Sequence, residues 1–254
     1  MKPDPEPAVT EFEARNRRII DRMGKDKALH KSSFDWIAQT ASYEYVYHFK
    51  WLGRPIIQYP QDILAMQELI WLIQPDLIIE TGIAHGGSLI FSASMLELNA
   101  ACGGPQDAKV LGIDIDIRDH NRAAIESHPM ASRIEMFEGS SIDPDMVTRV
   151  HDFAKDYSRI LVFLDSMHTH DHVLAELEAY TNLVSVGSYC CVFDTAIEDI
   201  KLNSFPNRPW DVGNNPKTAV HEWLKSNSHF EIDEAIHNKL LITVAPDGYL
   251  KRVK

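Results

Sequence analysis

The sequence predicts an α/β protein built on a doubly wound, mostly parallel sheet. Over residues 75–225, short apolar runs alternate with segments of helical spacing, the pattern of parallel strands joined by crossover helices. The runs are apolar along their whole length, as in strands that helices cover on both faces. Two further apolar runs near the C-terminus follow one another closely and predict a hairpin-like pair that closes the sheet.

Length and composition limit the function classes. The chain has 254 residues, enough for one large α/β domain with a sizeable core. Its formal net charge of −12 argues against nucleic acid or an anionic membrane surface as the main partner. The three cysteines form no disulfide framework and no metal-ligand spacing, which suits the cytoplasm. No apolar stretch approaches the roughly 20 residues that a membrane span requires.

Residues 1–74 are predicted to form a helical extension and lid, and residues 75–254 the α/β domain. Apolar spacing predicts an amphipathic helix over 9–23 and another over 63–73. Between them, residues 32–51 are rich in aromatic side chains. They form either a packing flap or a lid over a pocket, and both interpretations stay open because aromatic clusters are commonly core.

The elements of the predicted domain follow in order. We expect strands at 75–80, 109–116, 133–138, 160–165 and 188–194, and helices at 89–98, 120–127, 144–157, 172–184 and 217–225. Residues 230–233 and 240–244 then look like two strands without room for a helix between them, followed by a Pro-Asp-Gly turn.

The first strand leads into a glycine loop, residues 80–88, with the sequence ETGIAHGGS. Glycines allow a sharp turn and the close approach of a ligand, and the following helix offers unpaired N–H groups. The loop is neither Gly-x-Gly-x-x-Gly nor a P-loop, and fits Glu-x-Gly-x-x-x-Gly, the first motif of S-adenosylmethionine (SAM)-dependent methyltransferases. A purely structural turn is the alternative. The candidate cofactor-binding residues are Glu80, Gly82, His85, Gly86, Gly87 and Ser88.

Polar residues also follow the second and third strands. Asp114 ends the second strand, where a carboxylate suits two adjacent ribose hydroxyls, whereas Asp116 reads as a solvated or capping residue. Ser140 and Ser141, after the third strand, are candidates for contact with an adenine edge, or form a structural turn. Glu80 would hold the loop or the positively charged part of SAM.

Asp165 and Asp194 end the fourth and fifth strands. Two carboxylates that face one cleft repel each other unless a cation or a proton lies between them, and Mg²⁺ is the default hard cation for oxygen ligands. The alternative is a pair of helix caps. His168, His170 and His172 follow Asp165, and a histidine beside such a centre suits a general base. The His-x-His-x-His spacing is weak evidence for zinc.

Residues 80–88, 112–114, 164–168 and 246–252 together resemble the cephalosporin hydroxylase/rhamnosyl O-methyltransferase family, and the similarity runs from about Trp51 to the C-terminus. The resemblance implies a Rossmann-like Class I methyltransferase with a seven-stranded, mostly parallel sheet and an antiparallel C-terminal strand. It also implies SAM and Mg²⁺ as cofactors, with Asp165 and Asp194 as metal ligands and His168 as general base. Phe193 stands where some relatives carry Glu, so Thr195 or Glu198 is expected to supply the third ligand.

The resemblance leads to the primary hypothesis, a SAM-dependent, Mg²⁺-assisted O-methyltransferase for a hydroxyl of a sugar or other small polyhydroxylated metabolite. The aromatic segment and the 205–216 loop, with Trp210, Asn214 and Asn215, would form the acceptor pocket. Two alternatives are kept: a catalytically impaired SAM-binding partner subunit and a metal-dependent hydrolase. A homo-oligomer formed through the N-terminal helices is expected by family analogy.

Overall fold

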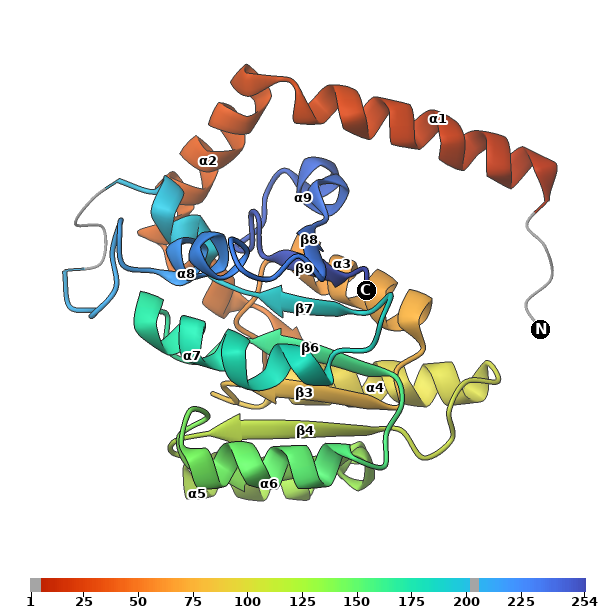
Figure 1. Cartoon of the computed structure of the whole chain (residues 1–254), viewed down its shortest axis with the longest axis vertical. Coiled ribbons are helices and arrows are strands. Elements are labelled where there is room, and N and C mark those ends of the chain that lie inside the picture. The colour runs from red at the N-terminus through yellow and green to blue at the C-terminus, as the bar shows by residue number, and fades with distance from the viewer. Residues whose placement is uncertain (1–5, 202–205) are drawn as a thin grey trace.

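The computed structural model describes residues 6–201 and 206–254. Seven strands within these residues form one sheet in the order β5-β4-β3-β6-β7-β9-β8 (Figure 1). All neighbours up to β7 are parallel, and β9 is antiparallel to both β7 and β8. The predicted fold class is thereby confirmed, including the antiparallel C-terminal strand. The strands are β3 (Leu77–Thr81), β4 (Lys109–Asp114), β5 (Ile134–Glu138), β6 (Ile160–Leu164), β7 (Tyr189–Val192), β8 (Phe230–Ile232) and β9 (Tyr249–Arg252).

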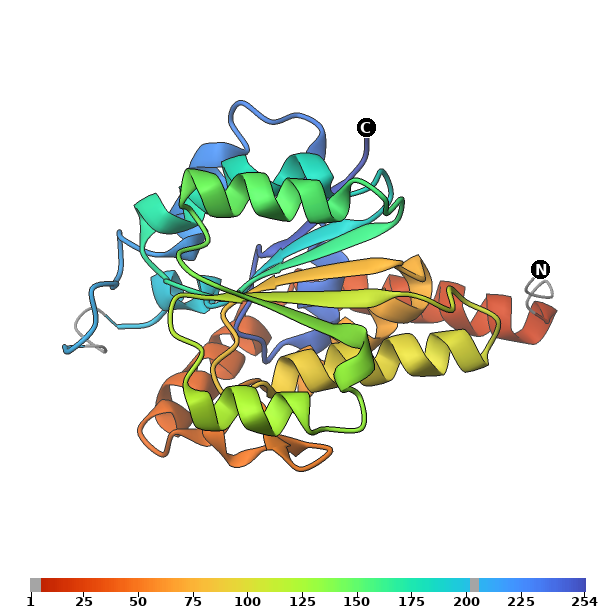
Figure 2. The same ribbon diagram turned by 90° about the horizontal axis from the view of Figure 1, so that it is seen from below.

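Helices cover both faces of this sheet, as Figure 2 shows in a view of the sheet from its edge. Successive residues of a strand point to opposite faces, and in β3 Ile78 joins one core cluster while Leu77 and Ile79 join the other. The first face carries α3 (Pro60–Ile73), α4 (Gly87–Ala101) and α5 (Asp119–Glu126). The second carries α6 (Pro144–Ala154), α7 (His170–Tyr180) and α8 (Pro216–Trp223). Short 3₁₀ helices are η2 (Ala131–Arg133), η3 (Thr181–Leu183) and η4 (Thr195–Asp199).

The N-terminal segment is helical, as predicted. It contains α1 (Pro7–Gly24), α2 (Lys27–Ala41), η1 (Tyr45–His48) and a hairpin of β1 (Lys50–Trp51) and β2 (Arg54–Pro55). α1 lies apart from the sheet and runs past α9 (Glu234–Leu240) (Figure 1). Within α1, all of which is described, no side chain is buried. None of the described helices is both long and apolar enough to cross a membrane.

The prediction for the C-terminal pair was wrong in one part. β8 forms as expected, but the helix α9 follows it, and residues 241–244 form a connection rather than a strand. Two of the apolar side chains that suggested a strand pack against the core instead, Leu240 from the last position of α9 and Val244 from this connection. The strand that completes the sheet is β9, after the Pro-Asp-Gly turn. An apolar run that covers the core from a loop has the same composition as a buried strand.

Asp62 fixes this connection to α3. Its carboxylate is fully buried and accepts hydrogen bonds from the Thr243 hydroxyl, from the Val244 N–H at 2.9 Å and from the Tyr249 hydroxyl at 2.8 Å. Burial raises the pKa of Asp62 to about 6 from its ordinary 3.8, although the hydrogen bonds lower it. The folded protein therefore binds this proton more tightly than the unfolded chain does.

The sign of this shift gives a testable stability effect. The free energy of unfolding of the wild type, relative to an Asp62→Asn variant that cannot titrate, is expected to fall by about 3 kcal/mol as pH rises from about 4 to about 6, and then to level off. Urea unfolding of both proteins at a series of pH values measures this difference. A difference that does not change with pH would contradict the prediction.

Candidate functional site

The glycine loop joins β3 to α4 at the carboxyl edge of the sheet. Gly82 has a φ of +90°, and a Cβ at this position would lie 2.1 Å from the carbonyl oxygen of Asp165. A Cβ on Gly87 would lie 2.0 Å from the carbonyl oxygen of Pro55. Only glycine permits both contacts, so the loop passes directly against the end of β6 on one side and the N-terminal hairpin on the other.

Asp114 holds this loop. One carboxylate oxygen, Oδ2, accepts hydrogen bonds from the N–H groups of Ile83 at 2.7 Å and Ala84 at 3.2 Å, and the other accepts from the N–H of Asp116 at 3.1 Å. A carboxylate offers about four lone-pair sites, so Asp114 retains capacity for a ribose hydroxyl. Asp116 is exposed and pairs with Arg118 at 3.7 Å, in line with the surface role predicted for it.

Glu80 lies beneath the start of α4 and is 2% exposed. The Ser88 hydroxyl donates a hydrogen bond to its Oε1, so these two predicted residues form one unit. Oε2 is enclosed and has no hydrogen-bond partner within the described residues. Burial raises the pKa of Glu80 to about 8, although the bond from Ser88 lowers it. The site thus contains a buried carboxyl group with one oxygen available to a donor.

His85 takes part in the loop through its backbone. Its carbonyl oxygen accepts hydrogen bonds from Arg54 Nε at 2.9 Å and Nη2 at 2.5 Å. Arg54 also donates to Asn121 Oδ1 at 2.9 Å, and Asn121 Nδ2 donates to the Ala84 carbonyl at 2.9 Å. The sequence reasoning missed Arg54 and Asn121, which tie the hairpin and α5 to the loop. The burial of Asn121 is visible only in the structure, so the sequence offered no signal for either residue.

Ser140 and Ser141 differ in their surroundings. The carbonyl of Ser140 accepts from the N–H of Asp143 at 3.1 Å, as in a turn. Ser141 is buried, and its hydroxyl donates to Glu176 Oε1 at 2.6 Å. The same hydroxyl oxygen lies 3.1 Å from His172 Nε2. Ser166, next to Asp165, donates to the same Glu176 oxygen at 2.7 Å. His172 thus belongs to a buried network beneath the strand ends, and Glu176 is a member that the sequence reasoning missed.

Three residues at the carboxyl edge form a possible metal centre. Asp165, His168 and Asp194 each offer one ligand atom, and these atoms all lie within 4.8 Å of one another. His168 Nε2 is 2.9 Å from Asp194 Oδ2. Burial, followed by the nearby Asp194 and Glu80 carboxylates, raises the pKa of Asp165 well above its ordinary value. Two carboxylates held this close fit a hard divalent cation, because its charge removes their repulsion.

A side chain from the N-terminal segment reaches this group. Gln58 is 3% exposed, and its Nε2 donates to Asp165 Oδ2 at 3.1 Å, while its Oε1 has no partner within the described residues. The neighbouring Tyr59 is buried and lies against Trp36 and Tyr45, with ring centroids 5.9 Å away in both cases. Part of the aromatic segment therefore packs beside the candidate centre. Nothing in the sequence pattern of this loop had indicated Gln58.

The residues expected to supply a third metal ligand make other contacts. Thr195 is fully buried, and its hydroxyl donates to the Pro246 carbonyl at 2.6 Å. Glu198 accepts from the Gly213 N–H at 2.7 Å and from Asn215 Nδ2 at 2.5 Å. Phe193 is buried and packs edge-on against Phe163. Among the His, Cys, Asp and Glu side chains of the described residues, His168 joins Asp165 and Asp194 in the group.

The loop predicted to line the acceptor pocket lies on the same side. The Trp210 ring contacts the His168 ring edge-on, with centroids 4.7 Å apart. Asn214 Oδ1 accepts from the His170 N–H at 3.0 Å. Asn215 is fully buried and caps α8 with its side chain, so its role is structural rather than that of a pocket-lining residue. Phe205 lies outside the described residues.

The strand order, the glycine loop after β3 and the acid at the end of β4 define a class I methyltransferase fold. The family model described as "Rhamnosyl O-methyltransferase/CmcI" matches residues 43–253, and the chain belongs to this family. It is therefore a methyltransferase.

Curated relatives and solved structures agree with this assignment. The chain is 31% identical over 196 residues to a rhamnosyl O-methyltransferase of Mycobacterium tuberculosis, covering 75% of this chain and 73% of the relative. It is 30% identical over 205 residues to that of Mycobacterium leprae, covering 80% and 82%. A structure of CmcI with Mg and SAM aligns with a TM-score of 0.57 at 17% identity, covering 82% of this chain and 78% of CmcI. The O-methyltransferase TomG of Streptomyces achromogenes aligns with a TM-score of 0.51 at 20% identity, covering 78% and 79%. At these identities the structures support the fold.

Proposed function

We propose that this protein is a SAM-dependent, Mg²⁺-assisted O-methyltransferase that acts on a hydroxyl of a sugar or another small polyhydroxylated metabolite. The observation that carries the proposal is the close approach of Gly82 to the Asp165 carbonyl. It places the glycine loop, where the cofactor would bind, directly beside the group of Asp165, His168 and Asp194. The rhamnosyl O-methyltransferases among its relatives and the Mg and SAM in the CmcI structure support the same chemistry.

In this proposal the cofactor lies along the carboxyl edge from β3 to β5. SAM supplies an electrophilic methyl group on a positively charged sulfur. The N–H groups at the start of α4 favour its carboxylate, and Asp114 accepts from its ribose hydroxyls. Glu80 lies where a positively charged amino group would find its free oxygen, and Ser141 fixes the loop beside the adenine. The loop residues Gly82, His85, Gly86, Gly87 and Ser88 shape this path.

The acceptor hydroxyl is placed at Asp165 and Asp194. A divalent cation held there supplies Lewis-acid activation of the hydroxyl. The donor set fits such an ion, since both carboxylates are hard oxygen ligands that repel each other without it. His168 takes the hydroxyl proton as general base, and its contact with Asp194 orients the imidazole. Gln58, Tyr59 and Trp210 border the acceptor.

The proposal includes the organisation of the chain. Residues 1–74 form a helical extension and lid, and residues 75–254 the methyltransferase domain. A homo-oligomer through the N-terminal helices is supported by the apolar residues exposed on α1, among them Phe12 at 60%. One observation favours the second candidate, a catalytically impaired partner subunit: the buried Phe193 offers no ligand atom where an acid was expected.

Calorimetric titration of SAM with and without Mg²⁺, followed by methylation assays on rhamnosides and polyols, tests the proposed function. An active enzyme binds SAM and methylates a glycoside only when the cation is present. SAM binding without turnover on any acceptor would favour the partner-subunit candidate. Failure to bind SAM under both conditions would contradict the proposed function and the partner-subunit candidate alike.

The raised pKa of Glu80 predicts a pH-dependent SAM affinity. A cationic ligand favours the ionised carboxylate, so binding below pH 8 requires release of a proton. The affinity is expected to rise by up to about tenfold per pH unit toward pH 8 and then to level off. Titrations in buffers of different ionisation enthalpy count the released proton. The Glu80→Gln variant is the control and should lose this part of the pH dependence; an unchanged profile in that variant would contradict the role of Glu80.

A further inference from the structure

Asp194 has an unusual backbone conformation. Although it is not a glycine, its φ of +56° lies in the left-handed region, and it directly precedes η4. A non-glycine residue in this region is strained, and the conformation persists only when the surrounding structure fixes it. The conformation ends the run of β7 and decides where the Asp194 carboxylate points. The contacts that fix this conformation therefore also fix the geometry of the candidate centre.

The turn at residues 245–248 provides the first support. The Thr195 hydroxyl donates to the Pro246 carbonyl at 2.6 Å, and the Ala196 N–H donates to the carbonyl of Val244, directly before the turn, at 3.0 Å. On the other side of Asp194, the Val192 N–H donates to the Gly248 carbonyl at 2.8 Å. A Cβ on Gly248 would lie 2.0 Å from the Val192 oxygen, so this contact needs glycine. The turn thus holds the chain on both sides of Asp194.

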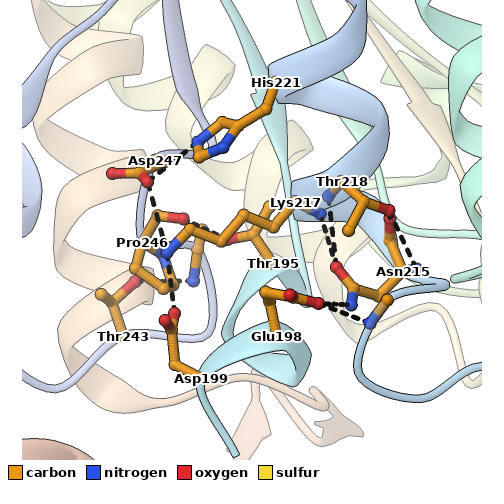
Figure 3. Close-up of polar contacts among 12 residues, drawn as sticks. Thr195, Glu198, Asp199, Asn215, Lys217, Thr218, His221, Thr243, Pro246 and Asp247 are labelled. Atoms are coloured by element: carbon orange, nitrogen blue, oxygen red, sulfur yellow. Dashed lines mark hydrogen bonds and ion pairs between the residues drawn. The ribbon is translucent and has the colours of Figure 1, made fainter.

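Lys217, on α8, contacts both η4 and the 245–248 turn, as Figure 3 shows. Its Nζ lies 2.8 Å from Asp199 Oδ2, at the end of η4, and 3.2 Å from Asp247 Oδ2, in the turn. The Lys217 side chain is only 12% exposed. Although burial lowers the pKa of Lys217, the two carboxylates raise it above its ordinary value. One ammonium group therefore joins the two segments that flank Asp194.

The position of Lys217 in its helix is otherwise unfavourable. It lies in the first turn of α8, where the helix dipole disfavours a positive charge. The two carboxylates compensate for this. Without the ammonium group, Asp199 and Asp247 would face each other with like charges, and the turn and η4 would move apart.

We propose that Lys217 is a positioning residue for Asp194. By joining Asp199 to Asp247, it keeps η4 and the 245–248 turn together, and these two segments hold Asp194 in its left-handed conformation. The inference rests on the proposed function, because it assumes that Asp194 binds a divalent cation. It also gives a role to the C-terminal Pro-Asp-Gly motif, which lies far from the glycine loop in sequence.

The test compares Mn²⁺ and SAM affinities, measured separately, in Lys217→Met and wild-type protein. Outer residues that orient a metal ligand typically contribute about 10–100-fold to metal affinity, and a loss of this size is expected here. SAM affinity measured in EDTA should not change. Lys217→Arg should recover part of the Mn²⁺ affinity, because a guanidinium can also bridge two carboxylates. The matched control is Lys239→Met, which removes a lysine paired with Glu68 on α3.

The outcomes separate this inference from the proposed function. If the wild type binds Mn²⁺ and Lys217→Met binds it equally well, the positioning role is wrong and the proposed function stands. If the wild type binds no divalent cation, the metal role of Asp194 fails and the positioning role fails with it. Should Lys217→Met not fold, Asp199→Asn removes one of the two carboxylates that Lys217 joins. The same loss of Mn²⁺ affinity is expected there, and an unchanged affinity would overturn the proposal.

Discussion

Replacing Asp165 with Asn is expected to lower metal-dependent kcat/KM by about 10³-fold, equivalent to about 4 kcal/mol of transition-state stabilisation. The substitution keeps the size of the side chain and an oxygen that can accept from Gln58, so the fold is expected to persist. What it removes is one of the two charges that would hold the cation in the proposed function. The measurement is methyl transfer at saturating SAM across a range of Mg²⁺ concentrations.

Two further observations make this result specific. SAM binding to Asp165→Asn should remain, because the cofactor loop contacts the Asp165 backbone rather than its carboxylate. Asp116→Asn is the matched control: Asp116 is an exposed acid just beyond the end of β4, at the same edge of the sheet, and its loss should leave activity unchanged. Full activity in Asp165→Asn would remove the metal role from the proposed function.

The parts of the site that were predictable follow from strand topology. Asp165 and Asp194 lie far apart in sequence, but each ends a parallel strand, and such ends meet at one edge of a sheet. Gly82 and Asp114 were predictable for the same reason. β3 and β4 are neighbours, and the loop after one strand therefore reaches the acid that ends the other. Local pattern and one topological rule suffice for these residues.

The residues that were missed depend on contacts that no local pattern encodes. Gln58 belongs to an irregular connection, and only the packing of Tyr59 against Tyr45 and Trp36 brings it to Asp165. In sequence, Glu176 looks like an ordinary helix residue. In the structure it accepts hydrogen bonds from Ser141 and Ser166, which follow two different strands of the sheet.

The contact of Thr195 was missed for a different reason. The left-handed Asp194 breaks the alternation of the strand, and the hydroxyl of the next residue, Thr195, donates to the Pro246 carbonyl. A sequence pattern contains no sign of a positive φ at an aspartate, because most such residues adopt ordinary conformations.

The second large effect is expected at His168, whose replacement by Gln should lower kcat by about 10²–10⁴-fold, the usual contribution of a general base. Glutamine retains hydrogen-bonding capacity next to Asp194 but cannot accept a proton at neutral pH. The affinities for SAM and Mn²⁺ should stay close to those of the wild type. Single-turnover methylation at saturating cofactor measures the chemical step, and His120→Gln, an exposed histidine on α5, is the control.

This variant also decides between two roles that the geometry of His168 allows. Its Nε2 lies in the same group of ligand atoms as the two carboxylates, so it is positioned either to take a proton or to bind the cation. A nitrogen lone pair used for a cation is not available for a proton. A fall in kcat with unchanged Mn²⁺ affinity, together with partial recovery of His168→Ala by added imidazole, identifies the base. A fall in Mn²⁺ affinity without recovery by imidazole would make His168 the third ligand and contradict the proposed base.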